Sequence, residues 1–248
     1  VWLATYIFHD DAAGRAVADA LVAAAGRGVA VRVVIDGFGS KATLDRVRQW
    51  LTTPNLALEV FRPMDRWWSW LLPSQMRRLH QKLCVVDGEV AWCGPGIRSP
   101  DLCSFGPHAR MRGPVVERLQ RLFLEAWHAT SSPTTLPQAD YFPSLKPAGH
   151  ARMGLALPSL SGGAPLQEGQ TLVDQVQRAR TQVMVSMVER APSRHLMKAL
   201  MATSASGVRV TVVVHRQALG WRWRERCADL LSVGAKVYRA DASCPFPC

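Results

Sequence analysis

The chain repeats a strand–helix–strand pattern, and this repeat restricts its fold more than any other feature of the sequence. Residues 3–37 and residues 183–216 each begin with an apolar run, continue with apolar residues at helical spacing and end in alternating valines. A glycine, Gly28 in one stretch and Gly207 in the other, stands where each helix is expected to end in a left-handed residue. Since two strands joined by a helix form a βαβ unit, the repeat predicts an α/β fold with parallel strands flanked by helices.

The two copies differ at their ends. A helix is expected ahead of the first strand of the second copy, at residues 171–180, and the first copy has no counterpart. The first copy continues into a further hairpin, whereas little sequence follows Tyr238 in the second copy. We therefore expect a piece of a longer two-copy protein, with a first repeat at residues 1–130, a linker rich in Pro, Ser and Thr at residues 131–168, and an incomplete second repeat at residues 169–248.

The stretch LHQKLCVVDG, residues 79–88, carries the residues with the clearest chemistry. His80 and Lys82 are expected on one face of a strand, because successive side chains of a strand point to opposite faces. The Asp-Gly pair at its end predicts a turn and a returning strand, so Asp87 could hold this hairpin or orient other groups. An imidazole can form a covalent phospho-intermediate, and an adjacent ammonium can hold the phosphate oxygens. The pair indicates phosphoryl transfer; the alternative is an ordinary half-buried histidine on an edge strand.

The spacing H-x-K-x4-D resembles the signature of the phospholipase D superfamily. Four stretches are similar to its bacterial cardiolipin synthase branch: TYIFHDDAAGR, GVAVRVVIDGFGS, RRLHQKLCVVDG and RGPVVERLQRLFLEAW. The resemblance implies a phospholipase D-like α/β sandwich of two pseudo-repeats with mixed or parallel sheets, each repeat normally contributing one motif to a shared site. It implies that His80 is a nucleophile or general acid, Lys82 a phosphate ligand and Asp87 the motif acid. The implied reaction moves a phosphatidyl group from one phosphatidylglycerol to the hydroxyl of another.

The chain departs from the family pattern in two respects. The segment after the hairpin reads GPGIRS, in which Gly94, Gly96 and Arg98 are the expected substrate-binding positions, with Arg98 where the family has an asparagine. A second motif is absent from the sequence, so we expect little activity from this chain alone. The family uses no metal ion and the six cysteines match no zinc-binding spacing, so neither a metal nor another cofactor is expected.

The net charge and a tryptophan cluster indicate which kind of partner the protein binds. The formal net charge of +11 favours anionic partners such as acidic lipids, phosphorylated substrates or nucleic acid, although most of the basic residues are arginines, as a GC-rich genome also produces. Trp67, Trp68 and Trp70 lie between arginines, a composition typical of a membrane interface; the alternative is a loop packed into the core. We expect a phospholipid substrate, phosphatidylglycerol, and peripheral contact with the cytoplasmic face of the inner membrane.

Two other functions remain open. One is a phosphodiesterase or nuclease that completes its site as a homodimer, since some superfamily members carry one motif per chain; nucleic acid is less expected than lipid. The other is a lipid-binding remnant without catalysis. The stretch DGFGS at residues 36–40 predicts a tight turn between a strand and a helix. His108 is expected to be structural or exposed.

Overall fold

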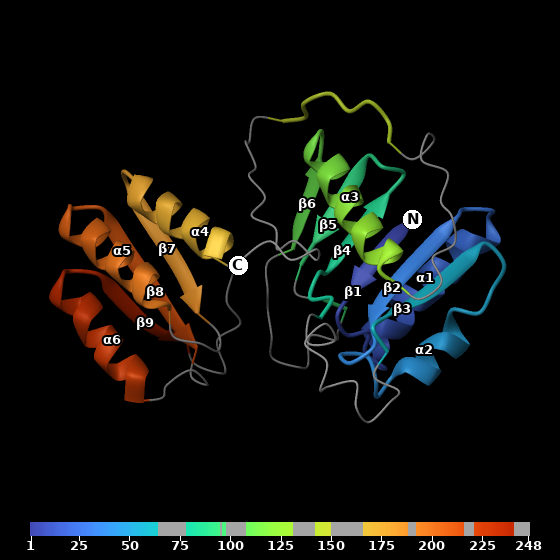
Figure 1. The fold of residues 1–248 in the computed structure, drawn as a ribbon, viewed down its shortest axis with the longest axis horizontal. Helices are drawn as coiled ribbons and strands as arrows, with labels where there is room; N and C mark the ends of the chain where they lie inside the picture. The colour runs from blue at the N-terminus through green and yellow to red at the C-terminus, as the bar shows by residue number, and fades with distance from the viewer. Residues whose placement is uncertain are drawn as a thin grey trace. The chain divides into compact units, whose positions relative to one another are not determined.

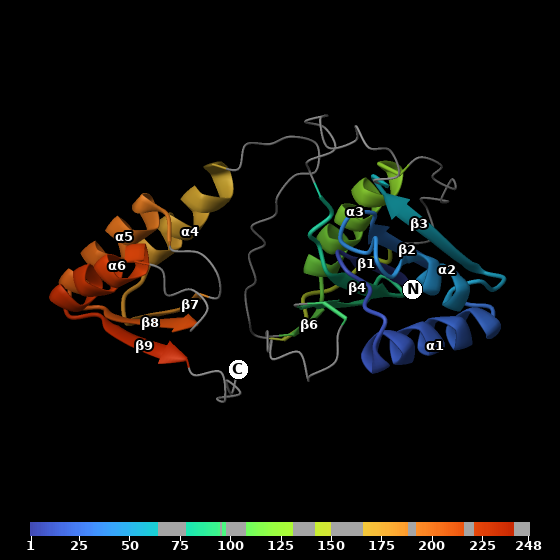
Figure 2. The ribbon, with the colours of Figure 1, turned by 90° about the horizontal axis from the view of Figure 1, so that it is seen from below.

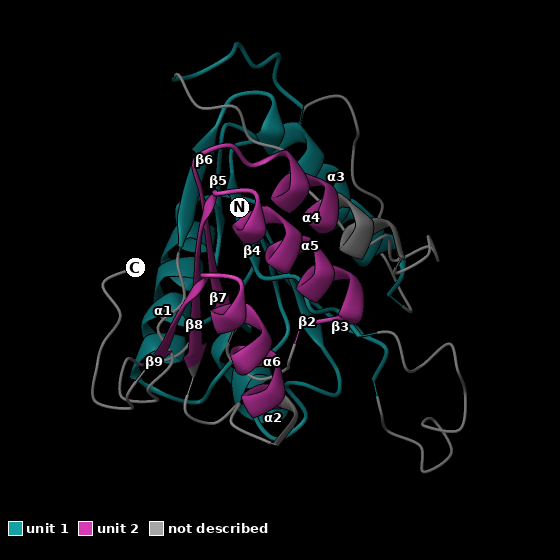
Figure 3. Ribbon diagram, turned by 90° about the vertical axis from the view of Figure 1, so that its left-hand side faces the viewer, with its two compact units in different colours: residues 1–155, 248 teal, residues 156–247 magenta. Residues whose placement is uncertain are grey.

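The computed structural model describes residues 1–63, 78–94, 96–97, 108–130, 142–149, 166–187, 192–215 and 221–240. The chain forms two compact units, residues 1–155 with Cys248 and residues 156–247 (Figure 3). Each unit has a sheet and a hydrophobic core of its own.

The first unit is built on a six-stranded mixed sheet with the strand order β3-β2-β1-β4-β5-β6 (Figure 1). Strands β1, β2 and β3 run parallel, β4 pairs antiparallel with β1, and β5 and β6 continue antiparallel. The elements are β1 Trp2–Thr5, α1 Ala12–Gly26, β2 Val31–Asp36, α2 Leu44–Trp50, β3 Leu56–Phe61, β4 Leu83–Val86, β5 Val90–Cys93, β6 Ala109–Arg112 and α3 Val115–His128.

Helices cover both faces of this sheet, with α1 on one side and α3 on the other (Figure 2). The alternation of side chains along β1 explains the two cores. Leu3 packs into the cluster that contains Leu21 of α1, whereas Trp2 stacks on Phe123 of α3 with 5.1 Å between ring centroids. Trp127 continues this aromatic layer and is fully buried. The faces of both helices are thus matched to a sheet that is apolar on both sides.

The second unit repeats the parallel part of the first. Its sheet has the order β7-β8-β9 with every pair parallel, and the core joins valines of β8 to residues of all three helices of the unit. The elements are α4 Leu166–Arg178, β7 Gln182–Met187, α5 Arg194–Ala205, β8 Arg209–His215, α6 Trp221–Ser232 and β9 Lys236–Ala240. Gly28 and Gly207 follow α1 and α5 with φ of 87° and 88°, which confirms the predicted helix ends. The predicted α/β fold with two βαβ copies is confirmed.

Within the described ranges, no helix has the length and apolar character needed to cross a bilayer. Trp67, Trp68, Trp70 and Arg98 lie outside the described residues, as do most of the residues of the predicted linker.

Candidate active site

His80 and Lys82 lie at the edge of the first sheet where the parallel strands end. Because β4 runs antiparallel to β1, with Leu83 opposite Ala4, the residues before β4 adjoin the residues after β1. The strand predicted for residues 79–88 is shorter than expected: it begins at Leu83, since its partner β1 ends at Thr5 and the chain then bends away. Ligands of α/β sheets commonly bind beyond the carboxyl ends of parallel strands, which is where both side chains lie.

The two motif side chains contact each other and an aromatic ring. Lys82 Nζ lies 3.2 Å from Nδ1 and 3.4 Å from Nε2 of His80, and it donates to the His80 carbonyl oxygen at 3.0 Å. The Tyr6 ring centroid lies 5.0 Å from that of His80 and 5.8 Å from Lys82 Nζ. Burial lowers the pKa of Lys82, whereas His80 is exposed. The site is therefore an accessible imidazole beside a partly desolvated amine.

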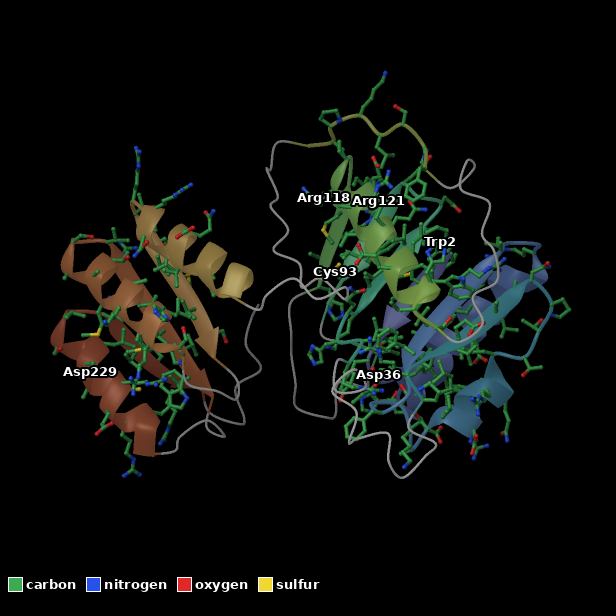
Figure 4. All side chains as sticks on the ribbon, viewed as in Figure 1. Trp2, Asp36, Cys93, Arg118, Arg121 and Asp229 are labelled. Atoms are coloured by element: carbon green, nitrogen blue, oxygen red, sulfur yellow. The ribbon has the colours of Figure 1, made fainter. Side chains whose placement is uncertain are left out.

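Asp36 fixes the chain directly before His80. It stands at the end of β2 (labelled in Figure 4), is fully buried, and accepts hydrogen bonds from the amides of Phe38 and Gly39, both at 2.9 Å. The same carboxylate accepts from the Leu79 amide at 2.8 Å and from Arg78 Nη2 at 2.8 Å and Nε at 3.1 Å. Asp36 thus accepts hydrogen bonds from four residues, two of which, Arg78 and Leu79, lie 42 and 43 positions away in the sequence. This buried carboxylate holds the segment before His80 against the end of β2.

The loop after Asp36 also holds Tyr6. A Cβ at Gly39 would lie 2.4 Å from the Tyr6 carbonyl oxygen and 2.8 Å from its ring, so the two segments touch only because this position is glycine. Ser40 Oγ donates to the Tyr6 carbonyl at 3.1 Å and accepts from the Phe8 amide at 3.1 Å. The predicted tight turn is confirmed by the bond from the Ser40 amide to the Asp36 carbonyl at 3.0 Å. Its role as a support for the Tyr6 ring was not predicted.

Asp87 is not brought together with His80 and Lys82. It lies in the turn between β4 and β5, five positions after Lys82, which at about 3.3 Å per position of extended chain is about 17 Å. Asp87 and Gly88 have φ of 54° and 68°, and the Glu89 amide donates to the Val86 carbonyl at 3.1 Å. The expected role of Asp87 as a catalytic residue therefore has no geometric support, whereas the predicted hairpin is present.

The predicted substrate-binding glycines do adjoin Lys82. The Gly94 amide donates to the Lys82 carbonyl at 3.4 Å, and a Cβ at Gly96 would lie 3.5 Å from Lys82 Cδ. A pocket of about 100 Å³ opens beside them and reaches His108, which is exposed, as predicted. It is lined by Leu3, Ala4, Thr5, Lys82, Leu83, Cys84, Trp92, Cys93, Gly94, Gly96, Ile97 and His108. Among the described residues, no group of three or more His, Cys, Asp or Glu side chains is placed to hold a metal ion.

Comparison with known proteins identifies relatives of this chain. Residues 1–95 match the family model described as cardiolipin synthase, PLD-like domain. The major cardiolipin synthase ClsA of Bacillus subtilis (strain 168) is 26% identical over 261 residues, covering 97% of this chain and 52% of ClsA. Cardiolipin synthase B of Shigella flexneri is 33% identical over 130 residues, covering 50% of this chain and 31% of that protein. Nuc of Salmonella typhimurium, a phospholipase D family member of known structure, has a TM-score of 0.39 and 20% identity, covering 52% of this chain and 77% of Nuc.

Residues 1–95, which include the H-x-K-x4-D motif at the edge of the mixed sheet, are therefore similar to the PLD-like domain of cardiolipin synthases, and the α/β fold of the first unit is phospholipase D-like. Nearly the whole chain is similar to part of a cardiolipin synthase. It spans about half the length of the B. subtilis relative.

Proposed function

We propose that this chain is a cardiolipin synthase-like phosphatidyltransferase that acts on phosphatidylglycerol through a phosphohistidine at His80. The observation that carries the proposal is the contact of Lys82 Nζ with the ring nitrogens of His80, at 3.2 and 3.4 Å, on an accessible edge of the sheet. The contact keeps the amine and the imidazole within reach of one phosphate, so Lys82 can bind its oxygens while His80 attacks phosphorus.

In the proposed reaction, Lys82 binds the non-bridging oxygens and offsets the charge that develops on them. A His80 nitrogen attacks the phosphorus of the first phosphatidylglycerol, the P–O bond to glycerol breaks, and the departing oxygen takes a proton from water. The hydroxyl of a second phosphatidylglycerol then forms the new P–O bond, the P–N bond to His80 breaks, and the hydroxyl proton passes to water. The Tyr6 ring, which contacts both motif side chains, limits the orientations open to them.

The test is to trap the covalent intermediate. The protein is mixed with vesicles containing phosphatidylglycerol labelled at phosphorus, quenched during turnover, digested and analysed for the modified peptide. Weak label on the peptide that carries His80 is expected, because little activity is expected from this chain alone, with none in His80→Ala and wild-type labelling in the control His128→Ala, which changes an exposed histidine at the end of α3. A labelled product formed without any adduct at His80 would overturn the mechanism.

We also propose that the chain acts at the cytoplasmic face of the inner membrane through peripheral contact. Trp92 of β5 is 36% exposed, and the Arg110 guanidinium lies 5.8 Å from its ring centroid. An exposed indole beside an arginine is suited to lipid headgroups, and Trp92 also lines the pocket that reaches Lys82. Sedimentation with anionic vesicles should weaken in Trp92→Ala and remain in Phe38→Ala, which removes another exposed aromatic ring. Equal vesicle binding by Trp92→Ala and Phe38→Ala would contradict membrane contact through Trp92. Protection from added protease in inverted membrane vesicles would show which leaflet the protein contacts.

A further inference from the structure

Tyr6 lies against both side chains of the His-Lys pair although it is far from them in the sequence. It follows β1, which ends at Thr5, and its ring centroid lies 5.0 Å from that of His80 with the ring planes inclined by 47°. The same centroid lies 5.8 Å from Lys82 Nζ, which in turn lies 3.2 and 3.4 Å from the ring nitrogens of His80. The three side chains thus form one cluster, in which each contacts the other two.

The chain around Tyr6 is anchored, so its ring has a fixed position. Ser40 Oγ donates to the Tyr6 carbonyl and accepts from the Phe8 amide, both at 3.1 Å. Phe8 is fully buried, and its carbonyl accepts from Thr43 Oγ1 at 2.6 Å. Gly39 closes one side, because a Cβ there would lie 2.8 Å from Cδ2 and Cε2 of the Tyr6 ring. The ring is therefore held between this loop and the two motif side chains.

The position of the Tyr6 ring bears on the charge of Lys82. The amine is half-buried, and burial lowers the pKa of Lys82 because the charged form loses hydration. The ion pairs among the described residues do not include Lys82, so no carboxylate offsets this loss there. An aromatic ring attracts a cation within about 6 Å of its centroid through its quadrupole. Together with the His80 carbonyl at 3.0 Å, the Tyr6 ring therefore favours the ammonium form.

We propose that Tyr6 is a positioning residue of the site, whose ring holds the Lys82 ammonium beside the His80 imidazole and stabilises its positive charge. The inference rests on the proposed phosphatidyl transfer at His80, in which Lys82 has to be charged to bind the phosphate oxygens. Tyr6 acts through Lys82 and forms no bond to the reacting atoms. The aromatic ring carries this role, and the hydroxyl is not needed for it.

The test compares Tyr6→Phe with Tyr6→Leu, because both variants lack the hydroxyl and only the first keeps an aromatic ring. The quantity measured is the pKa of the Lys82 amine in the substrate-free protein, by NMR titration of protein labelled with ¹³C in its lysine side chains. The Lys82 signal is assigned by its loss in Lys82→Arg. We expect this pKa to be lower in Tyr6→Leu than in Tyr6→Phe by about 0.3–0.7 of a pH unit.

The other titratable groups that face Lys82 are the same in both variants. They are His80, which contacts the amine, and Cys84, Cys93 and His108, which line the pocket beside it. A difference between the two variants therefore reports the ring. Tyr238→Leu is the matched control: it removes a tyrosine of β9 that is 53% exposed, and it should leave the pKa of Lys82 at its wild-type value.

The functional measurement is the single-turnover rate of adduct formation at His80 with labelled phosphatidylglycerol. We expect Tyr6→Phe to stay within about threefold of the wild-type rate and Tyr6→Leu to fall about tenfold, because the ammonium is no longer held in place. The rate should be lost as the pH rises through the pKa of Lys82, since the neutral amine cannot bind phosphate. This alkaline limb should therefore lie at lower pH in Tyr6→Leu than in Tyr6→Phe.

The outcomes separate this inference from the proposed function. An equal or higher pKa of Lys82 in Tyr6→Leu, equal rate losses in the two variants, or an unchanged rate in Tyr6→Leu would each overturn the role of Tyr6, while the adduct at His80 upholds the transferase. Absence of an adduct in the wild-type protein would overturn the transferase, and the pKa comparison, which needs no substrate, would still decide whether the ring stabilises the ammonium. Circular dichroism and thermal melting identify a misfolded variant, and Tyr6→Met, which also lacks a ring, then replaces Tyr6→Leu.

Discussion

Removal of the Asp36 carboxylate should both destabilise the first unit and release the chain that carries His80. Asp36 is fully buried and accepts hydrogen bonds from the Leu79 amide and from Arg78, whose side chain is only 15% exposed. Asp36→Ala leaves the guanidinium without its counter-ion and three backbone amides without their acceptor. Asp36→Asn keeps one acceptor oxygen and turns an amide group toward the donors.

The magnitude follows from these contacts. Breaking a buried pair by removing one partner costs about 3–5 kcal/mol, and each unsatisfied buried amide adds about 1–3 kcal/mol where water cannot reach it. Arg78 retains a bond from Nη2 to the Arg62 carbonyl at 2.9 Å and has some access to water, so the lower part of the range applies. We expect Asp36→Ala to lower the free energy of unfolding by about 6 kcal/mol, the lower values for the ion pair and the three amides taken together, and Asp36→Asn by about 2 kcal/mol.

Urea titration followed by circular dichroism measures the global loss, and hydrogen exchange at the Leu79 amide measures the local one. This amide should exchange at least about tenfold faster in Asp36→Asn than the global loss alone predicts, because its acceptor is changed. Glu117→Gln is the matched control: it removes an exposed partner of Arg121 in α3 and should cost less than about 0.5 kcal/mol. A cost below about 1 kcal/mol for Asp36→Ala, with unchanged exchange at Leu79, would refute the reasoning.

Three other changes test the packing and the site. Gly94→Ala brings a methyl group to 2.3 Å from Cδ2 of His108 and should lower phosphatidylglycerol turnover at least about tenfold in a folded protein, as steady-state kinetics would show. Trp127→Ala removes a fully buried indole and should cost about 3–5 kcal/mol in urea titration, against less than about 0.5 kcal/mol for the exposed His128→Ala. Burial raises the pKa of Cys84 from 9.0 to about 11, so the folded state keeps a proton that the unfolded chain releases. The contribution of Cys84 to stability is therefore present below pH 9 and should decrease by about 2–3 kcal/mol as the pH rises to 11; the same pH dependence in Cys84→Ala would contradict this.

Sequence patterns predicted the features that depend on a few adjacent residues. The left-handed residues that end α1 and α5, and the hairpin after Val86, follow from Gly28, Gly207 and an Asp-Gly pair. The motif strand was predicted too long, since the alternation of apolar residues continues back to Leu79 although the partner strand has already ended. Alternation reports which face a residue takes, but it does not report where pairing stops.

Patterns failed for contacts between distant segments. Arg78 and Asp36 are 42 positions apart, and nothing near either residue marks it as the partner of the other. His108 likewise has no motif around it, and only the register of β6 against β5 puts it opposite Gly94. Such positions become visible only when the register of β4, β5 and β6 is known.

The antiparallel reversal between β1 and β4 is the topological step that creates the site. Because β4 runs against β1, the residues before β4 meet the edge at which β1 and β2 end, where Tyr6 and Asp36 are found. The turn at Asp87 then sets the register of β4 against β5 and so puts Gly94 opposite Lys82. A slip of one residue would turn the side chains of β5 to the other face and replace the glycine beside Lys82 with a larger residue. Asp87 thus contributes to the site through the register it imposes, from the far end of the strand.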